Sequence, residues 1–193
     1  MMSVLWDKIK KLAIMKTGKM EKEQYFEQEL LIMGLLSTDH GVREEAKNRL
    51  ERLYGPSRYA GPTLPFIYTD YYNREMGNNI ERDFLAFETL VDPSRLAEIK
   101  TVTNELEQEY TVDGRRRINI DPGLLSLGKL ILASTKDNAQ RIPLSLGIYG
   151  EITLIFRQKS YRPERWTYPD YRSTEYLEIF HALREDLKKK LQD

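Results

Sequence analysis

The stretch FEQELLIMGLLS (residues 26–37) contains the feature that most restricts the fold, an unbroken apolar run at residues 30–36. An amphipathic helix or a half-exposed strand would place polar residues at regular intervals, and this run contains none. A short continuous apolar run is typical of a strand that is buried on both faces of a sheet. We therefore predict a central strand over 26–37.

The segments that follow alternate between helical and extended patterns. Asp39 suits a helix cap, and Gly55 suits the helix stop. Pro62 and Pro65 indicate that the second strand lies at a sheet edge. The predicted elements are a helix over 41–55, an edge strand over 61–72, a strand over 81–91, a helix over 93–106 and a strand over 116–120.

This β-α-β-β-α-β order predicts an α+β protein with a ferredoxin-like core, in which two helices cover one face of a four-stranded antiparallel sheet. Further along, we predict a helix over about 122–135, a β-hairpin over about 141–157 and a C-terminal helix from Ser173. Residues 25–193 would form a single domain. Residues 1–24 would form an N-terminal amphipathic helical extension, with an apolar stripe at Val4, Leu5, Ile9 and Leu12.

The composition excludes several classes of protein and of site. The 193 residues contain no apolar run long enough to cross a membrane and no secretory signal, and cysteine is absent, so we expect a cytoplasmic protein. Without cysteine there is no sulfur-based zinc site, and two histidines are too few for a histidine-based metal centre. If a metal binds, carboxylates must hold it, which favours Mg²⁺. The P-loop and Rossmann motifs are also missing, so the sequence does not identify a cofactor.

Charge is distributed unevenly along a chain whose net charge is zero. Acidic residues dominate 81–113, and basic residues dominate 114–165. Such asymmetry can mark an anion-binding surface. The alternative is that neighbouring elements neutralise one another.

Three carboxylates near strand ends are candidates for catalysis. Asp70 and Glu75, in a probable loop, could hold Mg²⁺ or act as an acid–base pair, or they could form only an Asx-turn and an ion pair with Arg74. Asp121 could serve the site, or it could cap a helix whose first residue is Pro122. We expect Asp70 and Asp121 at one end of the sheet, three strand spacings or roughly 14 Å apart, so that they bracket a ligand without sharing a metal ion.

Five residues are candidates for ligand binding. Lys136 and Arg141 could bind a phosphate or carboxylate group. Glu151 lies on a polar stripe of the predicted hairpin, which could line a ligand site or face water. Trp166 and Tyr168 could stack on a base, or they could hold an irregular segment against the core.

Several segments together resemble an uncharacterised bacterial family known as domain of unknown function 4416. They are TDYYNREMG (69–77), RRRINIDPGLLSLGKLILASTKDN (115–138), GIYGEITLIFR (147–157) and WTYPDYRS (166–173). The resemblance covers roughly residues 25–190 and implies a shared fold, but it carries over no catalytic role. Where we expect the family to have a histidine before Arg141, this chain has Gln140, which weakens any mechanism with a histidine base there.

Two functions are compatible with these features. The first is a binding protein or small enzyme for a phosphate-bearing ligand, such as a nucleotide or an RNA end, and the sequence does not decide between binding and catalysis. The second is a non-enzymatic module that forms a homodimer through its sheet or its N-terminal helix. Neither function involves a membrane.

Overall fold

The computed structural model describes residues 25–192, and the apolar run at 30–36 lies at its centre. This run belongs to β1 (Glu29–Ser37), in which every residue is buried. β1 pairs antiparallel with β4 (Glu81–Val91) on one side and with β7 (Asn119–Leu125) on the other. The prediction of a buried central strand is therefore confirmed.

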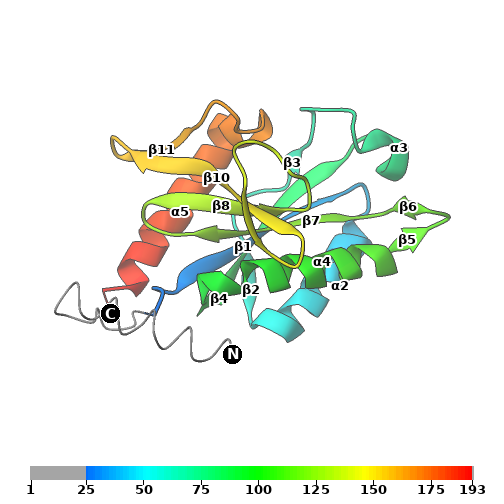
Figure 1. The fold of residues 1–193 in the computed structure, drawn as a ribbon. Coiled ribbons are helices and arrows are strands. Elements are labelled where there is room, and N and C mark those ends of the chain that lie inside the picture. The colour runs from blue at the N-terminus through cyan, green and yellow to red at the C-terminus, as the bar shows by residue number, and fades with distance from the viewer. Residues whose placement is uncertain (1–24, 193) are drawn as a thin grey trace, which may run out of the picture.

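The sheet extends from β1 in antiparallel steps (Figure 1), in the order β11-β10-β8-β7-β1-β4-β2, with β3 beside β4 and β9 beside β10. The other strands are β2 (Ser57–Tyr59), β3 (Leu64–Pro65), β8 (Lys129–Ser134), β9 (Ile142–Ser145), β10 (Ile148–Arg157) and β11 (Ser160–Pro163), and β5 (Thr111–Val112) and β6 (Arg115–Arg116) form a separate pair. The protein is thus α+β with a mostly antiparallel sheet, as predicted. In the described residues that sheet has nine strands, more than the predicted core.

Three longer helices begin where the sequence predicts them. In α2 (His40–Tyr54) the Asp39 carboxylate accepts a hydrogen bond from the Val42 N–H at 3.1 Å. α4 (Leu96–Glu109) follows the short 3₁₀ helix η1 (Pro93–Arg95), and α5 (Thr174–Lys190) is capped by the Ser173 hydroxyl. Two short helices, α3 (Asn73–Met76) and η2 (Asp170–Arg172), lie in the connecting segments.

Alternate residues of β1 point to opposite faces of the sheet, so both faces carry apolar side chains that must be buried. Helices cover both faces. Leu31, Met33 and Leu35 face a core that includes residues of α2 and α4. Leu30 and Ile32 face a second core that includes residues of α5, which lies on the other side of the sheet (Figure 1). The predicted pair of helices on one face is present, and the C-terminal helix supplies the opposite layer.

The predicted helix over 122–135 is wrong, because this segment forms the antiparallel hairpin β7–β8. Asp121 does not cap a helix but pairs with Gly34 inside the sheet. Pro122 is tolerated there because β8 pairs with β7 only from Gly123 onward, so one side of the strand is open at the proline. The leucine spacing suits a helix, but the short turn Ser126–Gly128 separates two strands.

One further prediction changes in the structure, and one is confirmed. The edge strand predicted over 61–72 is reduced to β3, and residues 66–72 form a loop instead. The hairpin predicted over 141–157 is present as β9–β10, and its turn has positive φ at Leu146 (55°) and Gly147 (73°). The predicted extension at 1–24 lies outside the described residues. Within 25–192 none of the helices combines the length and apolar character needed to cross a membrane.

Candidate functional site

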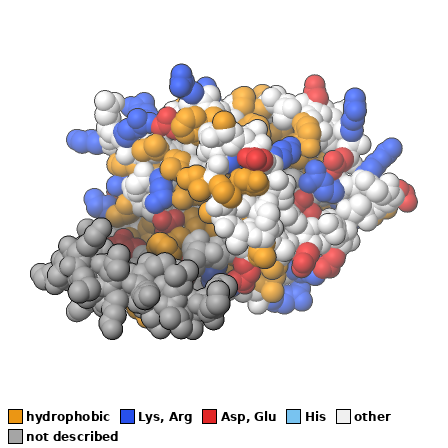
Figure 2. Space-filling model, in the orientation of Figure 1, with side chains coloured by type: hydrophobic (Ala, Val, Ile, Leu, Met, Phe, Trp, Pro, Cys, Tyr) orange, Lys and Arg blue, Asp and Glu red, His pale blue; other side chains and the backbone are white. Residues whose placement is uncertain are grey.

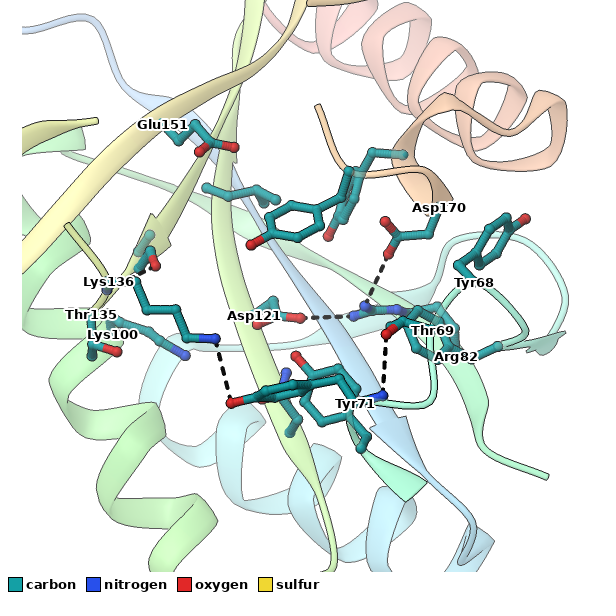
Figure 3. A pocket seen from close by; sticks show the side chains of 18 of the residues that line it. Tyr68, Thr69, Tyr71, Arg82, Lys100, Asp121, Thr135, Lys136, Glu151 and Asp170 are labelled. Carbon is teal, nitrogen blue, oxygen red and sulfur yellow. Dashed lines mark hydrogen bonds and ion pairs between the residues drawn. The ribbon is translucent and has the colours of Figure 1, made fainter. Parts of the chain in front are cut away.

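A cavity of about 570 Å³ lies at the end of the sheet where β1 ends and where β4 and β7 begin. Its walls come from segments far apart in the sequence, which the fold brings together (Figure 3). They are the loop after β3, the start of β4, α4, the start of β7, the end of β8 with the loop that follows, β10 and the segment around η2.

Arg82 forms the floor of this cavity. Its side chain is only 2% exposed, and its guanidinium lies 5.6 Å from the ring centres of both Phe66 and Phe84. One terminal nitrogen lies 3.1 Å from a carboxylate oxygen of Asp121, and the other lies 3.5 Å from one of Asp170. The two carboxylates thus lie on either side of one buried cation (Figure 3).

The two carboxylates titrate in opposite directions. Burial alone would raise the pKa of Asp121, but the positive charges of Arg82 and Lys100 bring it below its ordinary value. Burial raises the pKa of Asp170, and Arg82 offsets this only in part. Asp121 is also the more accessible, with a side chain that is 25% exposed against 8% for Asp170. Asp121 is therefore the ionised carboxylate that a ligand can reach.

A second group of paired charges forms the wall made by α4. Lys100 donates a hydrogen bond to the Ile120 carbonyl at 2.8 Å and lies 3.6 Å from the Glu107 carboxylate. Glu107 accepts hydrogen bonds from the Ile120 N–H at 2.8 Å and from Arg116 at 2.9 Å. Burial raises the pKa of Glu107 in spite of these partners. Arg116 also contacts Glu75, so each charge in this wall has a partner of opposite sign.

Lys136 differs from the other cations of the cavity. Its ammonium lies 3.4 Å from the Tyr71 hydroxyl and 4.5 Å from the centre of the Tyr71 ring, as Figure 3 shows. In the part of the chain that the structure describes, no carboxylate lies within ion-pair distance of it. Lys136 is thus a cation without an anionic partner at the edge of a cavity.

Arg141 is buried, and hydrogen bonds within the described residues engage two of its three guanidinium nitrogens. It donates hydrogen bonds at 2.8 Å to the Glu151 carboxylate, the Ser134 hydroxyl and the Lys136 carbonyl. Gln140 donates to the same Glu151 carboxylate at 3.0 Å. Arg141 and Glu151 therefore fix the segment 134–136 that carries Lys136.

The structure brings five of the eight predicted site residues to this cavity: Asp121, Lys136, Arg141, Glu151 and Tyr168. The other three lie elsewhere. Asp70 is exposed, and its carboxylate accepts a hydrogen bond from the side-chain amide of Asn73 at 2.9 Å, not from a backbone N–H as in an Asx-turn. Glu75 forms an ion pair with Arg116, not with Arg74. Trp166 donates its ring N–H to the Ile152 carbonyl at 2.9 Å.

Asp70 and Glu75 therefore bind different partners and do not form a common metal site. Among residues 25–192 no three histidine or acidic side chains are grouped so that they could hold a metal ion. Asp121 lies near the start of β7 and not at the end of a strand, and this position brings it to the cavity.

The sequence analysis did not identify Arg82, Lys100, Glu107 or Asp170 as site residues. The first three could have been found from the sequence, because each is a charged residue on a face that the predicted strand or helix would bury. Arg82 alternates with Phe84 and Ala86 in β4, and Lys100 and Glu107 lie on the buried face of α4. Charged side chains are rarely buried unless they are paired, so such positions indicate a polar site. Asp170 had no comparable signal.

Comparison with known proteins gives one match. The family described as "Domain of unknown function (DUF4416)" matches residues 27–187. No curated protein and no solved structure matches the chain.

Proposed function

We propose that this chain, which belongs to the DUF4416 family of unknown function, binds a small phosphate-bearing molecule in the cavity, with Lys136 contacting the phosphate. The volume of about 570 Å³ lies in the range of small-molecule sites, and a nucleotide would fit it. Tyrosine side chains, among them Tyr68, Tyr71 and Tyr168, line it together with polar groups. Apolar and aromatic walls with a few polar groups are typical of such sites.

The free ammonium of Lys136 carries this proposal. Arg82, Lys100, Arg116 and Arg141 already form ion pairs, so a ligand anion would compete with protein carboxylates for each of them. At Lys136, as far as residues 25–192 are concerned, an anion meets the hydroxyl and ring of Tyr71 and no carboxylate. A charge-assisted hydrogen bond to phosphate is stronger than one between neutral groups. Arg141 then supports the site by holding the Lys136 backbone.

The proposed function is binding, and Asp121 is the carboxylate that could act on a bound molecule. Asp70 and Glu75 have no part in it, because neither lines the cavity. We also infer a ferredoxin-like core, which the order β7-β1-β4-β2 and the placement of α2 and α4 on one face support. We infer a cytoplasmic location from the absence of cysteine.

Substitution of Lys136 tests the proposal. Calorimetric titration with inorganic phosphate, pyrophosphate and adenosine monophosphate should show binding by the wild type, and Lys136→Met should weaken it by about tenfold or more, since a hydrogen bond to a charged group contributes about 1.5–3 kcal/mol. The stability should change by less than about 0.5 kcal/mol, because Lys136 is exposed.

Lys188→Met is the matched control, because Lys188 is an exposed lysine in α5. This variant should bind the same probes as the wild type does. Equal binding by Lys136→Met and the wild type would contradict the proposal, as would a wild type that binds none of the three.

A second candidate function rests on β9. All four of its residues are exposed, and the apolar side chains of Ile142, Leu144 and Leu146 are 63%, 46% and 69% exposed. In the described structure β9 pairs only with β10, so its other edge is open. On the face drawn in Figure 2, hydrophobic side chains gather over the part of the sheet near β10. An open strand edge with apolar side chains favours pairing with another chain, so self-association through the sheet is the alternative.

A further inference from the structure

We propose that the floor of the cavity binds vicinal hydroxyl groups of a sugar, with Asp121 accepting their hydrogen bonds. A sugar phosphate or a nucleotide would then bind more tightly than inorganic phosphate or a phosphate ester without hydroxyl groups. This inference rests on the proposed function only for the binding of the phosphate group. The binding of the hydroxyl groups depends on a different set of residues.

Asp121 has a carboxylate oxygen that can accept a further hydrogen bond. Arg82 donates to Oδ2 at 3.1 Å, whereas Oδ1 receives no hydrogen bond of normal geometry from the residues that the structure describes. The side chain is 25% exposed, and it lines the cavity. An ionised carboxylate only accepts hydrogen bonds, and its two oxygens can receive two neighbouring O–H groups. Acidic residues bind the ribose hydroxyl groups of dinucleotides in the same way.

Two buried polar groups beside Asp121 also need a partner. Tyr171 and Asn119 line the cavity and are 3% and 5% exposed. The Tyr171 hydroxyl and the Asn119 Nδ2 form no hydrogen bond within the described chain. Asn119 does approach the carboxylate, since it contributes to the low pKa of Asp121, but without normal hydrogen-bond geometry. Buried polar groups are rarely left unpaired, because an unpaired one lowers the stability of the fold.

A hydroxyl group suits this position better than an amine or a metal ion does. Arg82 and Lys100 already supply positive charge to Asp121, so the carboxylate needs no cationic ligand group to neutralise it. A neutral hydroxyl adds no charge to a site whose charges are already paired. It also both donates and accepts, so it can satisfy Asp121 on one side and Tyr171 or Asn119 on the other.

Removing hydroxyl groups from the ligand tests the inference without altering the protein. Calorimetry would compare ribose 5-phosphate with 2-deoxyribose 5-phosphate, and adenosine monophosphate with its 2′-deoxy and 2′,3′-dideoxy forms. We expect the wild type to lose about 10- to 100-fold in affinity for each deoxy form, as for loss of a hydrogen bond to a charged group. In Asp121→Asn that difference should fall below about threefold.

Tyr171→Phe provides a second variant that should remain folded, because it removes a hydroxyl that has no partner. It should bind the hydroxylated probes severalfold more weakly than the wild type does, with the melting temperature unchanged or higher. If its affinities for all probes equal those of the wild type, Tyr171 does not contact the ligand, and the proposed hydroxyl site on the cavity floor is wrong.

The outcomes separate this inference from the proposed function. If hydroxylated and deoxy probes bind equally and binding still depends on Lys136, the inference is wrong and the proposed function stands. If free ribose binds, depends on Asp121 and is indifferent to Lys136→Met, the inference stands and the phosphate proposal is wrong. If the wild type binds no probe, both are wrong.

Discussion

Arg82 lies inside the sheet with a carboxylate on each side of its guanidinium. Without it, Asp170 would lose its ion-pair partner, and Asp121 would keep only the positive charge of Lys100 in a largely buried place. Removing one partner of a buried ion pair is strongly destabilising, by about 3–5 kcal/mol, because the remaining charge is uncompensated. Arg82 therefore determines both the stability of this region and the ionised state of Asp121.

We predict that Arg82→Met lowers the free energy of unfolding by about 3–5 kcal/mol at pH 7. The loss should shrink as the pH falls below about 4. The folded-state pKa of Asp121 is depressed, so the stability it contributes is fully present above the unfolded pKa of about 3.9 and is lost as the pH falls from there through the lower folded-state pKa. Urea denaturation at pH 7 and at several pH values below about 4 measures both effects.

The control is Arg58→Met, which breaks the exposed ion pair with Asp186 and should cost at most about 1 kcal/mol at either pH. An Arg82→Met variant as stable as Arg58→Met would show that the three charged groups on the cavity floor do not depend on one another.

The hairpin β7–β8 shows how far the sequence determines an element. The apolar and polar residues of INIDPGLLSLGKLILAS fit a helix and a pair of strands about equally well, because short apolar runs do not fix the period. The pairing of β7 with β1 decides between them, and that pairing involves residues about ninety positions apart. β1, α2 and β4 were predictable because cap residues and regular periods are local signals. The hairpin depends on a tertiary contact.

Gly123 tests this hairpin. A Cβ atom there would lie 2.7 Å from a Leu132 methyl group and 2.8 Å from the Ile131 carbonyl oxygen. The carbonyl belongs to the backbone of β8, which cannot move aside as a side chain can. We predict that Gly123→Ala lowers the free energy of unfolding by about 1–3 kcal/mol, the usual cost of overpacking. Gly128→Ala in the turn of the same hairpin meets nothing within 4 Å and should change it by less than about 0.5 kcal/mol. Equal losses in chemical denaturation would mean that the two strands do not pack as described.

At the scale of the whole molecule, the cavity exists only because the sheet order brings distant segments together. Lys136 and Asp121 could be predicted because both follow recognisable local patterns, a loop cation and an acid beside a strand. Arg82 and Asp170 could not be predicted to meet, because they are 88 residues apart and come from β4 and η2. Asp70 misled the prediction because its segment was taken for a strand end, whereas the chain turns there into α3.

The same sheet order leaves β9 at an open edge, and this edge carries the last prediction. Ile142, Leu144 and Leu146 expose large apolar side chains beside an unpaired row of backbone groups, which natural proteins usually protect. If the alternative function is correct, light scattering at increasing protein concentration should show a dimer. The double substitution Leu144→Lys and Leu146→Lys should return it to a monomer with little change in stability.

Val112→Lys is the matched control, because Val112 is 53% exposed in the separate β5–β6 pair, and it should leave the dimer intact. Deleting residues 1–20 distinguishes the sheet edge from the N-terminal segment. A dimer that survives the β9 substitutions but not the deletion would move the contact to that segment. A wild type that stays monomeric at every concentration contradicts self-association by either route, and it would leave ligand binding in the cavity as the remaining proposal.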